Sequence, residues 1–266
     1  MRLRFSILLV VIIWGGFALN EVKAQSDSVD TMAPAHKSDS SEPVKKEDEV
    51  VLLLARAADA APNSESRWMT ALIEAYFEFK SAGFDKIKII PHDSIEAVFP
   101  EHSDFSKYPS ENNYFDIAKK FNAQHVGIQK FELQLRQKTM FYYLEIYSAK
   151  TREIQTTVER SFKLNTIGTE FDEIFNTLLK EFNIKIPPVL SRFVKIPAIS
   201  SDQKTLKMLG ECIIRERFSS IVDSALVANE YVKVCDKDRN MLLAYYQAGS
   251  FLETVGKYND AAQAYN

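Results

Sequence analysis

The amino-acid sequence predicts an α/β (α+β) fold, a mixed five-stranded sheet with about three helices, followed by an all-helical repeat segment. Two observations support the first part: strand-like apolar runs alternate with helical periodicity over residues 49–188, and residues 124–164 alternate apolar and polar side chains with period two. That alternation is typical of antiparallel strands with one buried face. From residue 202 onward the pattern is helical throughout, which predicts the second part.

The first 24 residues have the pattern of a signal peptide. Two arginines precede an apolar run from Phe5 to Leu19, and Ala24 before Gln25 offers a cleavage site of small residues. The alternative is an uncleaved anchor, but the run is shorter than the ~20 apolar residues that a membrane helix needs. We therefore expect a periplasmic or secreted protein of the cell envelope, with no stable membrane span after cleavage.

Residues 25–48 consist mainly of Ser, Asp, Lys, Glu and Pro. Such a segment buries too little apolar area to offset its ordering entropy. It predicts a disordered tether, and a binding tail is the alternative.

The whole chain carries a net charge of −3 with a pI near 5.9. This balance argues against nucleic-acid binding, which needs a basic face.

The elements of the α/β part follow from local patterns. Val50 to Leu54 is an uninterrupted apolar run, typical of a central strand that is covered on both faces. Asn63 or Ser64 can cap the next helix, and Ser110 opens a later one. We expect the helices to pack mainly on one side of the sheet. The expected order is strand 50–54, helix 64–83, strand 86–90, short helix 94–98, helix 110–121, three strands within 124–164, and helix 169–182.

The last part of the chain contains an internal repeat. After a linker at 189–201, the helical pattern of 202–266 has two units offset by 39 residues, the second of them incomplete. Either the natural chain continues beyond Asn266 or another chain covers this end, because repeat arrays need a polar cap. The matching positions are Leu206, Leu209, Gly210 and Ile213 with Tyr245, Ala248, Gly249 and Leu252.

The second unit resembles a tetratricopeptide repeat. The positions that match the motif are Tyr245, Ala248, Gly249, Leu252, Gly256, Tyr258, Ala261 and Tyr265. Gly249 and Ala261 are expected to let the two helices of this unit approach closely, and Gly210 has the equivalent place in the first unit. The resemblance implies protein binding through a groove, and we expect Tyr245, Tyr246 and Gln247 to face it.

Residues 49 to about 188 resemble the TolB amino-terminal-like domain. The segments IAKKFNAQHVGIQKFEL and LEIYSAKTREIQ match the family pattern, with Gly127, Ala149, Thr151, Glu153 and Ile154 at motif positions. Ser148, Arg152 and Thr156 or Thr157 depart from it. The resemblance implies an adaptor, or an accessory part of a ring or pore, and no enzymatic activity.

Motifs that carry chemistry are absent from the sequence. It contains no nucleophile elbow, phosphate loop, zinc-protease or dinucleotide motif. His92 with Asp93, and His102 with Asp104, have no known ligand spacing, so we expect surface or capping roles for them. His36 lies in the tether, and His125 begins a strand. We therefore expect no catalytic residue, no metal and no cofactor.

The two cysteines are expected to be free. Cys212 and Cys235 lie about five residues before and about sixteen after the turn of the first helix pair. At 1.5 Å per residue their Cα atoms are offset by roughly 15 Å, and a disulfide needs about 7 Å or less. We expect two buried thiols.

One strand carries aromatic side chains on both faces. The first interpretation is a sheet face covered by the linker or the repeats, and the alternative is an aromatic surface that binds a partner, with Tyr143 and Tyr147 as its candidates. Phe141, Tyr143 and Tyr147 share one face, opposite Tyr142, Leu144 and Ile146.

These features predict an exported, non-enzymatic adaptor or scaffold of the bacterial envelope, which binds other envelope proteins through the helical repeats and the α/β domain. One alternative is a structural accessory subunit of an envelope ring or secretion pore. A second alternative is a hydrolase that uses loop residues near His92 and His102. The sequence leaves the partner, the biological process and the oligomeric state open.

Overall fold

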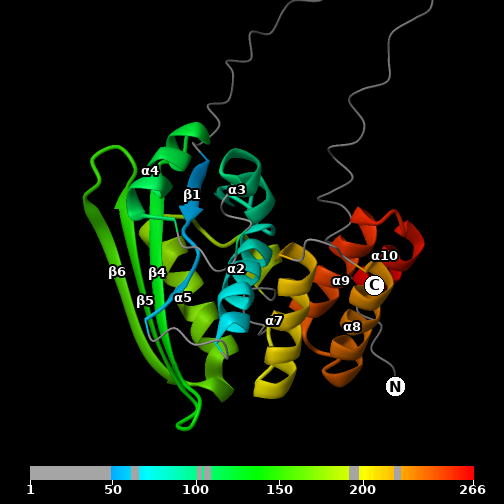
Figure 1. The fold of residues 1–266 in the computed structure, drawn as a ribbon. Helices are drawn as coiled ribbons and strands as arrows, with labels where there is room; N and C mark the ends of the chain where they lie inside the picture. The colour runs from blue at the N-terminus through cyan, green and yellow to red at the C-terminus, as the bar shows by residue number, and fades with distance from the viewer. Residues whose placement is uncertain (1–48, 61–65, 101–103, 105–108, 192–197, 219–222) are drawn as a thin grey trace, which may run out of the picture. The chain divides into compact units, whose positions relative to one another are not determined.

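The computed structural model describes residues 49–60, 66–100, 104, 109–191, 198–218 and 223–266, and Figure 1 shows how their helices and strands are arranged. Several predictions lie outside these ranges. They concern the signal peptide with its cleavage between Ala24 and Gln25, the tether 25–48, the helix cap at Asn63 or Ser64, and the two histidines His36 and His102. All of them stay predictions.

The sheet is mixed, as the sequence predicts. Its strand order is β3-β1-β4-β5-β6, and β2 pairs with β4 beside this path. β1 runs parallel to β3 and β4, whereas β4, β5 and β6 form antiparallel hairpins. The strands are β1 (Val50–Leu54), β2 (Ala58–Asp59), β3 (Ile87–Ile89), β4 (His125–Gln134), β5 (Thr139–Ser148) and β6 (Ile154–Lys163).

The sixth strand, β2, was not predicted. Its two residues continue the path of β1 after an interruption at residues 55–57, and they pair in parallel with Lys130 and Phe131 of β4. Ala58 and Asp59 have little intrinsic preference for a strand. Pairing with β4 determines the strand conformation of these two residues, so the local sequence pattern could not predict this strand.

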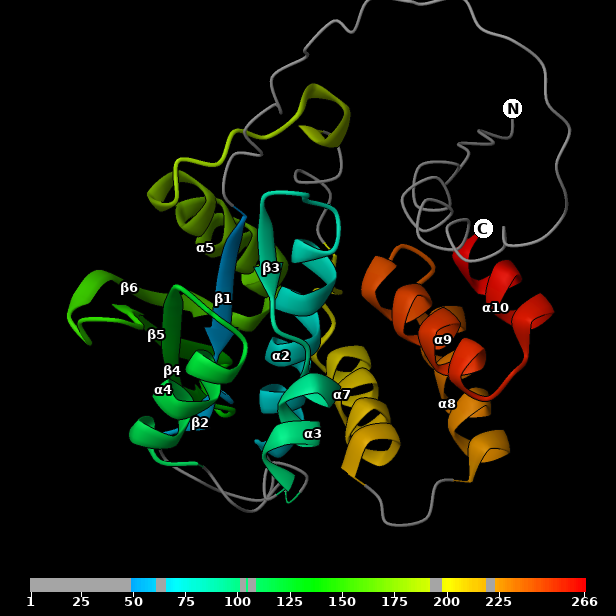
Figure 2. The same ribbon diagram turned by 90° about the horizontal axis from the view of Figure 1, so that it is seen from above.

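Helices cover both faces of the parallel part of the sheet, which corrects the expectation that they pack mainly on one side. The physical reason lies in β1, because Leu52 and Leu54 join one buried cluster while Leu53 joins another. α2 and α5 contribute to the first cluster, and α3 and α4 to the second (Figures 1 and 2). The helices are α2 (Arg67–Ser81), α3 (His92–Val98), α4 (Glu111–Lys120) and α5 (Ile167–Glu181), and short 3-10 turns span Leu164–Thr166 and Pro188–Leu190.

The C-terminal segment is helical, as predicted, and it packs on the α/β part through α2. The buried cluster that fills one face of the sheet continues into this segment, where it includes Leu209 and Phe251. Figure 2 shows α7 between α2 and the remaining helices. The four helices are α7 (Gln203–Phe218), α8 (Ser224–Lys237), α9 (Leu242–Thr254) and α10 (Tyr258–Tyr265).

Gly210 has a different role from the one expected for it. A Cβ atom at this position would lie 2.3 Å from the backbone oxygen of Trp68 in α2. The glycine therefore allows α7 to approach α2, and its close neighbour is not the second helix of its own pair. Gly249 does lie at a helix pair, because a Cβ atom there would meet the ring of Tyr265 in α10. Ala261 of α10 is buried as well.

Candidate functional site

The outward face of β4, β5 and β6 is exposed beyond the place where α4 packs on β4. Phe141 projects from it with 42% of its surface accessible. A shallow hollow of about 380 Å³ lies on this part of the sheet. Residues from all three strands line it, among them Lys130, Glu132, Phe141, Tyr143, Glu159 and Ser161. We call these six residues the open sheet face.

Glu145 holds the two tyrosines that the sequence suggested for this surface. The hydroxyl of Tyr143 donates to its Oε1 at 2.6 Å, and that of Tyr147 donates to its Oε2 at 2.8 Å. The hydrogen bond to Glu145 raises the pKa of Tyr143 to about 12, and burial raises that of Tyr147 to about 12. The two hydrogen bonds to Glu145 set the orientations of both phenols, which are neutral near pH 7 as an ordinary tyrosine is.

The two tyrosines differ in their surroundings. The ring of Tyr147 packs edge-on against Phe115 of α4, with 5.8 Å between the ring centroids. Tyr143 instead lines the hollow next to Phe141. Tyr143 therefore belongs to the open sheet face, and Tyr147 marks the border at which α4 begins to cover the sheet.

The predicted groove residues of α9 make contacts inside the chain. Gln247 is only 3% exposed, so it cannot belong to a binding surface, which corrects its assignment. It shares one face of α9 with Leu243 and Phe251, four residues away on either side, and this face is turned into the core. The ring of Tyr246 lies 5.1 Å from that of Phe79 in α2. Tyr245 donates its hydroxyl to the backbone oxygen of Cys235 at 3.4 Å.

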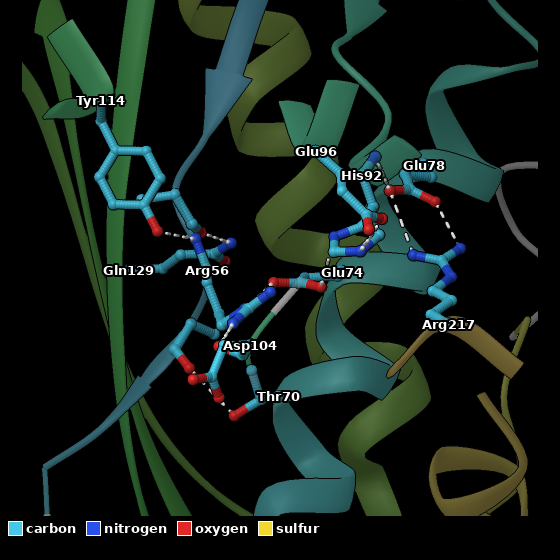
Figure 3. Close-up of polar contacts among 12 residues, drawn as sticks. Arg56, Thr70, Glu74, Glu78, His92, Glu96, Asp104, Tyr114, Gln129 and Arg217 are labelled. Atoms are coloured by element: carbon cyan, nitrogen blue, oxygen red, sulfur yellow. Dashed lines mark hydrogen bonds and ion pairs between the residues drawn. The ribbon is translucent and has the colours of Figure 1, made fainter. Parts of the chain in front are cut away.

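A buried polar network lies where β1 is interrupted. The Arg56 side chain is fully buried there, with its Nε 3.3 Å from Oε1 of Glu74 and its Nη1 donating to the backbone oxygen of Asp104 at 3.1 Å. Figure 3 shows these groups converging on the guanidinium. The guanidinium also lies over the ring of Phe218 in α7, 4.9 Å from the centroid. Burial raises the pKa of Glu74, and the charge of Arg56 opposes this rise.

Side chains replace the sheet hydrogen bonds that this interruption removes. Gln129 donates to the backbone oxygen of Ala55 at 2.7 Å and accepts from the hydroxyl of Tyr142 at 2.7 Å. Thr70 donates to the backbone oxygen of Ala57 at 3.0 Å. Buried backbone groups need such partners, so these contacts explain why a sheet core contains Gln129.

Glu78 joins three elements. Its Oε1 accepts the backbone N–H of His92 at 2.9 Å, at the start of α3. Its Oε2 lies 2.7 Å from Nη2 of Arg217 in α7. A single carboxylate of α2 thus positions both α3 and α7, and Figure 3 shows it between them.

His92 is buried, which corrects the expectation that it lies at the surface or serves as a cap. It is the first residue of α3 and is 2% exposed. The chain turns at Pro91 after β3 and brings the ring edge-on to Phe218, with 4.7 Å between the centroids. His92, Asp93 and Glu96 have donor atoms within 4.8 Å of one another. The sequence could not reveal this burial, because Phe218 belongs to a remote helix.

His125 and the two cysteines were also singled out in the sequence. Nδ1 of His125 lies 2.7 Å from Oε1 of Gln155 in β6, so this histidine has a hydrogen-bond partner within the sheet. Cys212 and Cys235 are free and buried, which confirms that prediction.

A void of about 20 Å³ lies beside Glu74, Glu78 and His92. That volume holds about one water molecule or an ion. It has no room for an organic substrate, so this cluster offers no support for the hydrolase alternative.

In the described ranges, no helix combines the length and apolarity that a bilayer span requires.

No protein-family model and no curated protein sequence matches the chain. Among solved structures, the LpoB C-terminal domain from Salmonella enterica aligns with 44% of this chain and 84% of its own length, at a TM-score of 0.35 and 12% identity. Lipoprotein GNA1162 from Neisseria meningitidis aligns with 48% of this chain and 96% of its own length, at a TM-score of 0.36 and 10% identity. The resemblances to the TolB amino-terminal-like domain and to tetratricopeptide repeats stay predictions.

Proposed function

We propose that the protein is an exported, non-enzymatic accessory protein of the cell envelope that binds a partner protein through the open sheet face. The observation that carries this proposal is the exposure of Phe141 beside a hollow of about 380 Å³ on the antiparallel part of the sheet. Aromatic side chains in such positions are frequent anchors of protein interfaces. The signal-peptide pattern of the first 24 residues supports export.

The open sheet face supports partner binding better than the predicted groove residues of α9 do. Tyr246 and Gln247 already pack inside the chain, as described above. The outward side chains of β4 to β6 instead surround the hollow with apolar, hydroxyl, carboxylate and ammonium groups. We therefore assign the helices α7 to α9 a scaffolding role and the sheet the binding role.

The chemistry of the hollow indicates what a partner presents. The Phe141 ring offers an apolar contact, and Glu132 and Glu159 are acidic groups at its sides. The Tyr143 hydroxyl is directed to Glu145. Lys130 and Arg160 line the hollow as well, so a partner fits it with an apolar side chain flanked by groups of both charge signs, placed opposite their counterparts at the rim.

Affinity capture from envelope extracts tests the proposal. The mature chain is compared with a Phe141→Ser/Tyr143→Ser variant. A Val232→Ser variant is the control, because it replaces an apolar side chain that is 56% exposed on α8. We expect the mature chain and the control to retain the same protein and the sheet variant to lose it. Recovery of no specific protein, or equal recovery by the sheet variant, would overturn the proposal. A large closed oligomer in native mass measurements would instead favour the ring or pore alternative.

A further inference from the structure

Three metal-binding side chains converge at the start of α3. His92, Asp93 and Glu96 each place a donor atom within 4.8 Å of the other two. Nε2 of His92 lies 3.6 Å from Oε2 of Glu96, one turn further along the helix. Tetrahedral ligands at about 2.0–2.1 Å from Zn²⁺ are about 3.3–3.4 Å apart. The distance between His92 and Glu96 is therefore close to that between two zinc ligands.

Glu74 of α2 provides a second, independent observation. Its side chain is only 9% exposed, and its Oε1 is occupied by Arg56. Its Oε2 is buried, has no hydrogen-bond partner in the described part of the chain, and lies 3.9 Å from Nδ1 of His92. Figure 3 shows His92 between Glu74 and Glu96. Histidines that bind metals usually donate their other ring N–H to a carboxylate, and Glu74 has this position.

The charges around the cluster favour a cation. Glu78 faces Arg217, and Glu74 faces Arg56, so each of these two carboxylates is balanced by a guanidinium. Asp93 and Glu96 have no comparable guanidinium among the ion pairs of the described residues. A divalent ion would balance these two carboxylates.

We propose that His92, Asp93 and Glu96 bind one divalent transition-metal ion, and that Glu74 orients the His92 ring for it. One imidazole and two carboxylates suit Zn²⁺ better than Mg²⁺ or Ca²⁺, which prefer oxygen ligands alone. The site follows the carboxyl end of β3, which is parallel to β1, and ligands of open α/β sheets bind at this edge. The ion holds α3 against α2.

Isothermal titration of the chelator-treated mature chain with Zn²⁺ tests the proposal, and Co²⁺ absorption reports the coordination geometry. We expect one ion per chain. Asp93→Asn and Glu96→Gln each weaken binding by at least about tenfold, and Glu74→Gln by about 10–100-fold. Glu211→Gln, at an exposed position of α7, leaves the affinity unchanged.

The ligand variants alter side chains that are not buried, so they are expected to fold, and circular dichroism checks this. The proposal is overturned if no Zn²⁺ binds at concentrations on the order of 0.1 mM. It is also overturned if Asp93→Asn and Glu96→Gln bind as tightly as the natural chain. Binding that disappears in His36→Ala or His102→Ala would assign the ion to another part of the chain.

Discussion

Oε2 of Glu78 lies 2.7 Å from Nη2 of Arg217, and this ion pair joins α2 to α7 across 139 residues of sequence. Both side chains are largely buried, with 17% and 11% of their surfaces exposed. Glu78 also accepts the backbone N–H of His92. One carboxylate therefore adds to the apolar packing that attaches the helical segment to the α/β part, and the effect of removing it can be measured.

Glu78→Gln should lower the free energy of unfolding by about 1.5–3 kcal/mol, the range for hydrogen bonds to charged groups. The variant keeps the size of the side chain and loses its charge. Urea unfolding followed by circular dichroism measures the change. Glu211→Gln is the matched control, because its pair with Lys207 is exposed and should contribute at most about 1 kcal/mol. Equal effects of the two substitutions would contradict the role of Glu78.

Gly210→Ala should destabilise the protein more than Gly249→Ala. At position 210 the new methyl group would meet the backbone of Trp68, which cannot move without displacing α2. At position 249 it would meet the ring of Tyr265, a side chain that can rotate. We expect a loss of about 1–3 kcal/mol or more for the first substitution and a smaller loss for the second. Urea unfolding of both variants decides the order, and the reverse order would refute this packing.

The buried contact between Lys80 and Asp172 joins α2 to α5. Nζ of Lys80 lies 2.7 Å from Oδ1 of Asp172, which also accepts the hydroxyl of Tyr76 at 2.5 Å. Asp172→Asn removes the carboxylate that balances a buried ammonium, so we expect a loss of about 3–5 kcal/mol at neutral pH. Tyr76→Phe, which removes only a hydrogen bond, should cost about 0.5–1.5 kcal/mol.

The pH dependence of the Asp172→Asn variant has a defined sign. Burial lowers the pKa of Lys80 from its ordinary value of 10.5, and the charge of Asp172 opposes this, so the substitution lowers it further. Between the lowered pKa and 10.5 the unfolded chain binds more protons, and stability rises with pH. The destabilisation should therefore be smaller at about pH 9.5 than at about pH 7. A loss that grows over this interval would contradict the burial of Lys80.

The thiols should be unreactive until the chain unfolds. Burial raises the pKa of Cys212 to about 12 and that of Cys235 to about 11, so the reactive thiolate is scarce at about pH 8. We expect a thiol reagent to react slowly with the native protein and to find two thiols per chain after denaturation without reductant. Finding no thiol in the denatured chain would show a disulfide and refute the free state.

The antiparallel part of the fold is predictable because its signal is local. The alternation along β4, β5 and β6 specifies which side chains face the core, and Met140 to Ile146 follow it on β5. Residues whose environment comes from remote segments were misjudged. His92 is buried by Phe218 of α7, and Gly210 is packed by Trp68 of α2.

The candidate surface was predicted only in part, because local periodicity places some of its residues and contacts with remote segments determine the others. Tyr143 lies on the open sheet face, and Phe141 was already placed beside it by the period of the strand. Gln247 was assigned to a surface because the resemblance to a tetratricopeptide repeat implies a groove, and the periodicity of α9, which is apolar around most of its circumference, could not test this assignment. In the structure Gln247 is buried against the core. Glu74 and Glu78 could not be found from sequence, since their partners come from separate elements.

Site-specific photo-cross-linking in the cells that make the protein tests partner binding by the open sheet face most directly. A photoreactive residue replaces Ser161, which lines the hollow, and in a second strain it replaces Val232 on α8. We predict a discrete adduct with another protein from position 161, its loss in a Phe141→Ser background, and no such adduct from position 232. Adducts from position 232 alone, or an adduct from position 161 that persists without Phe141, would contradict the account.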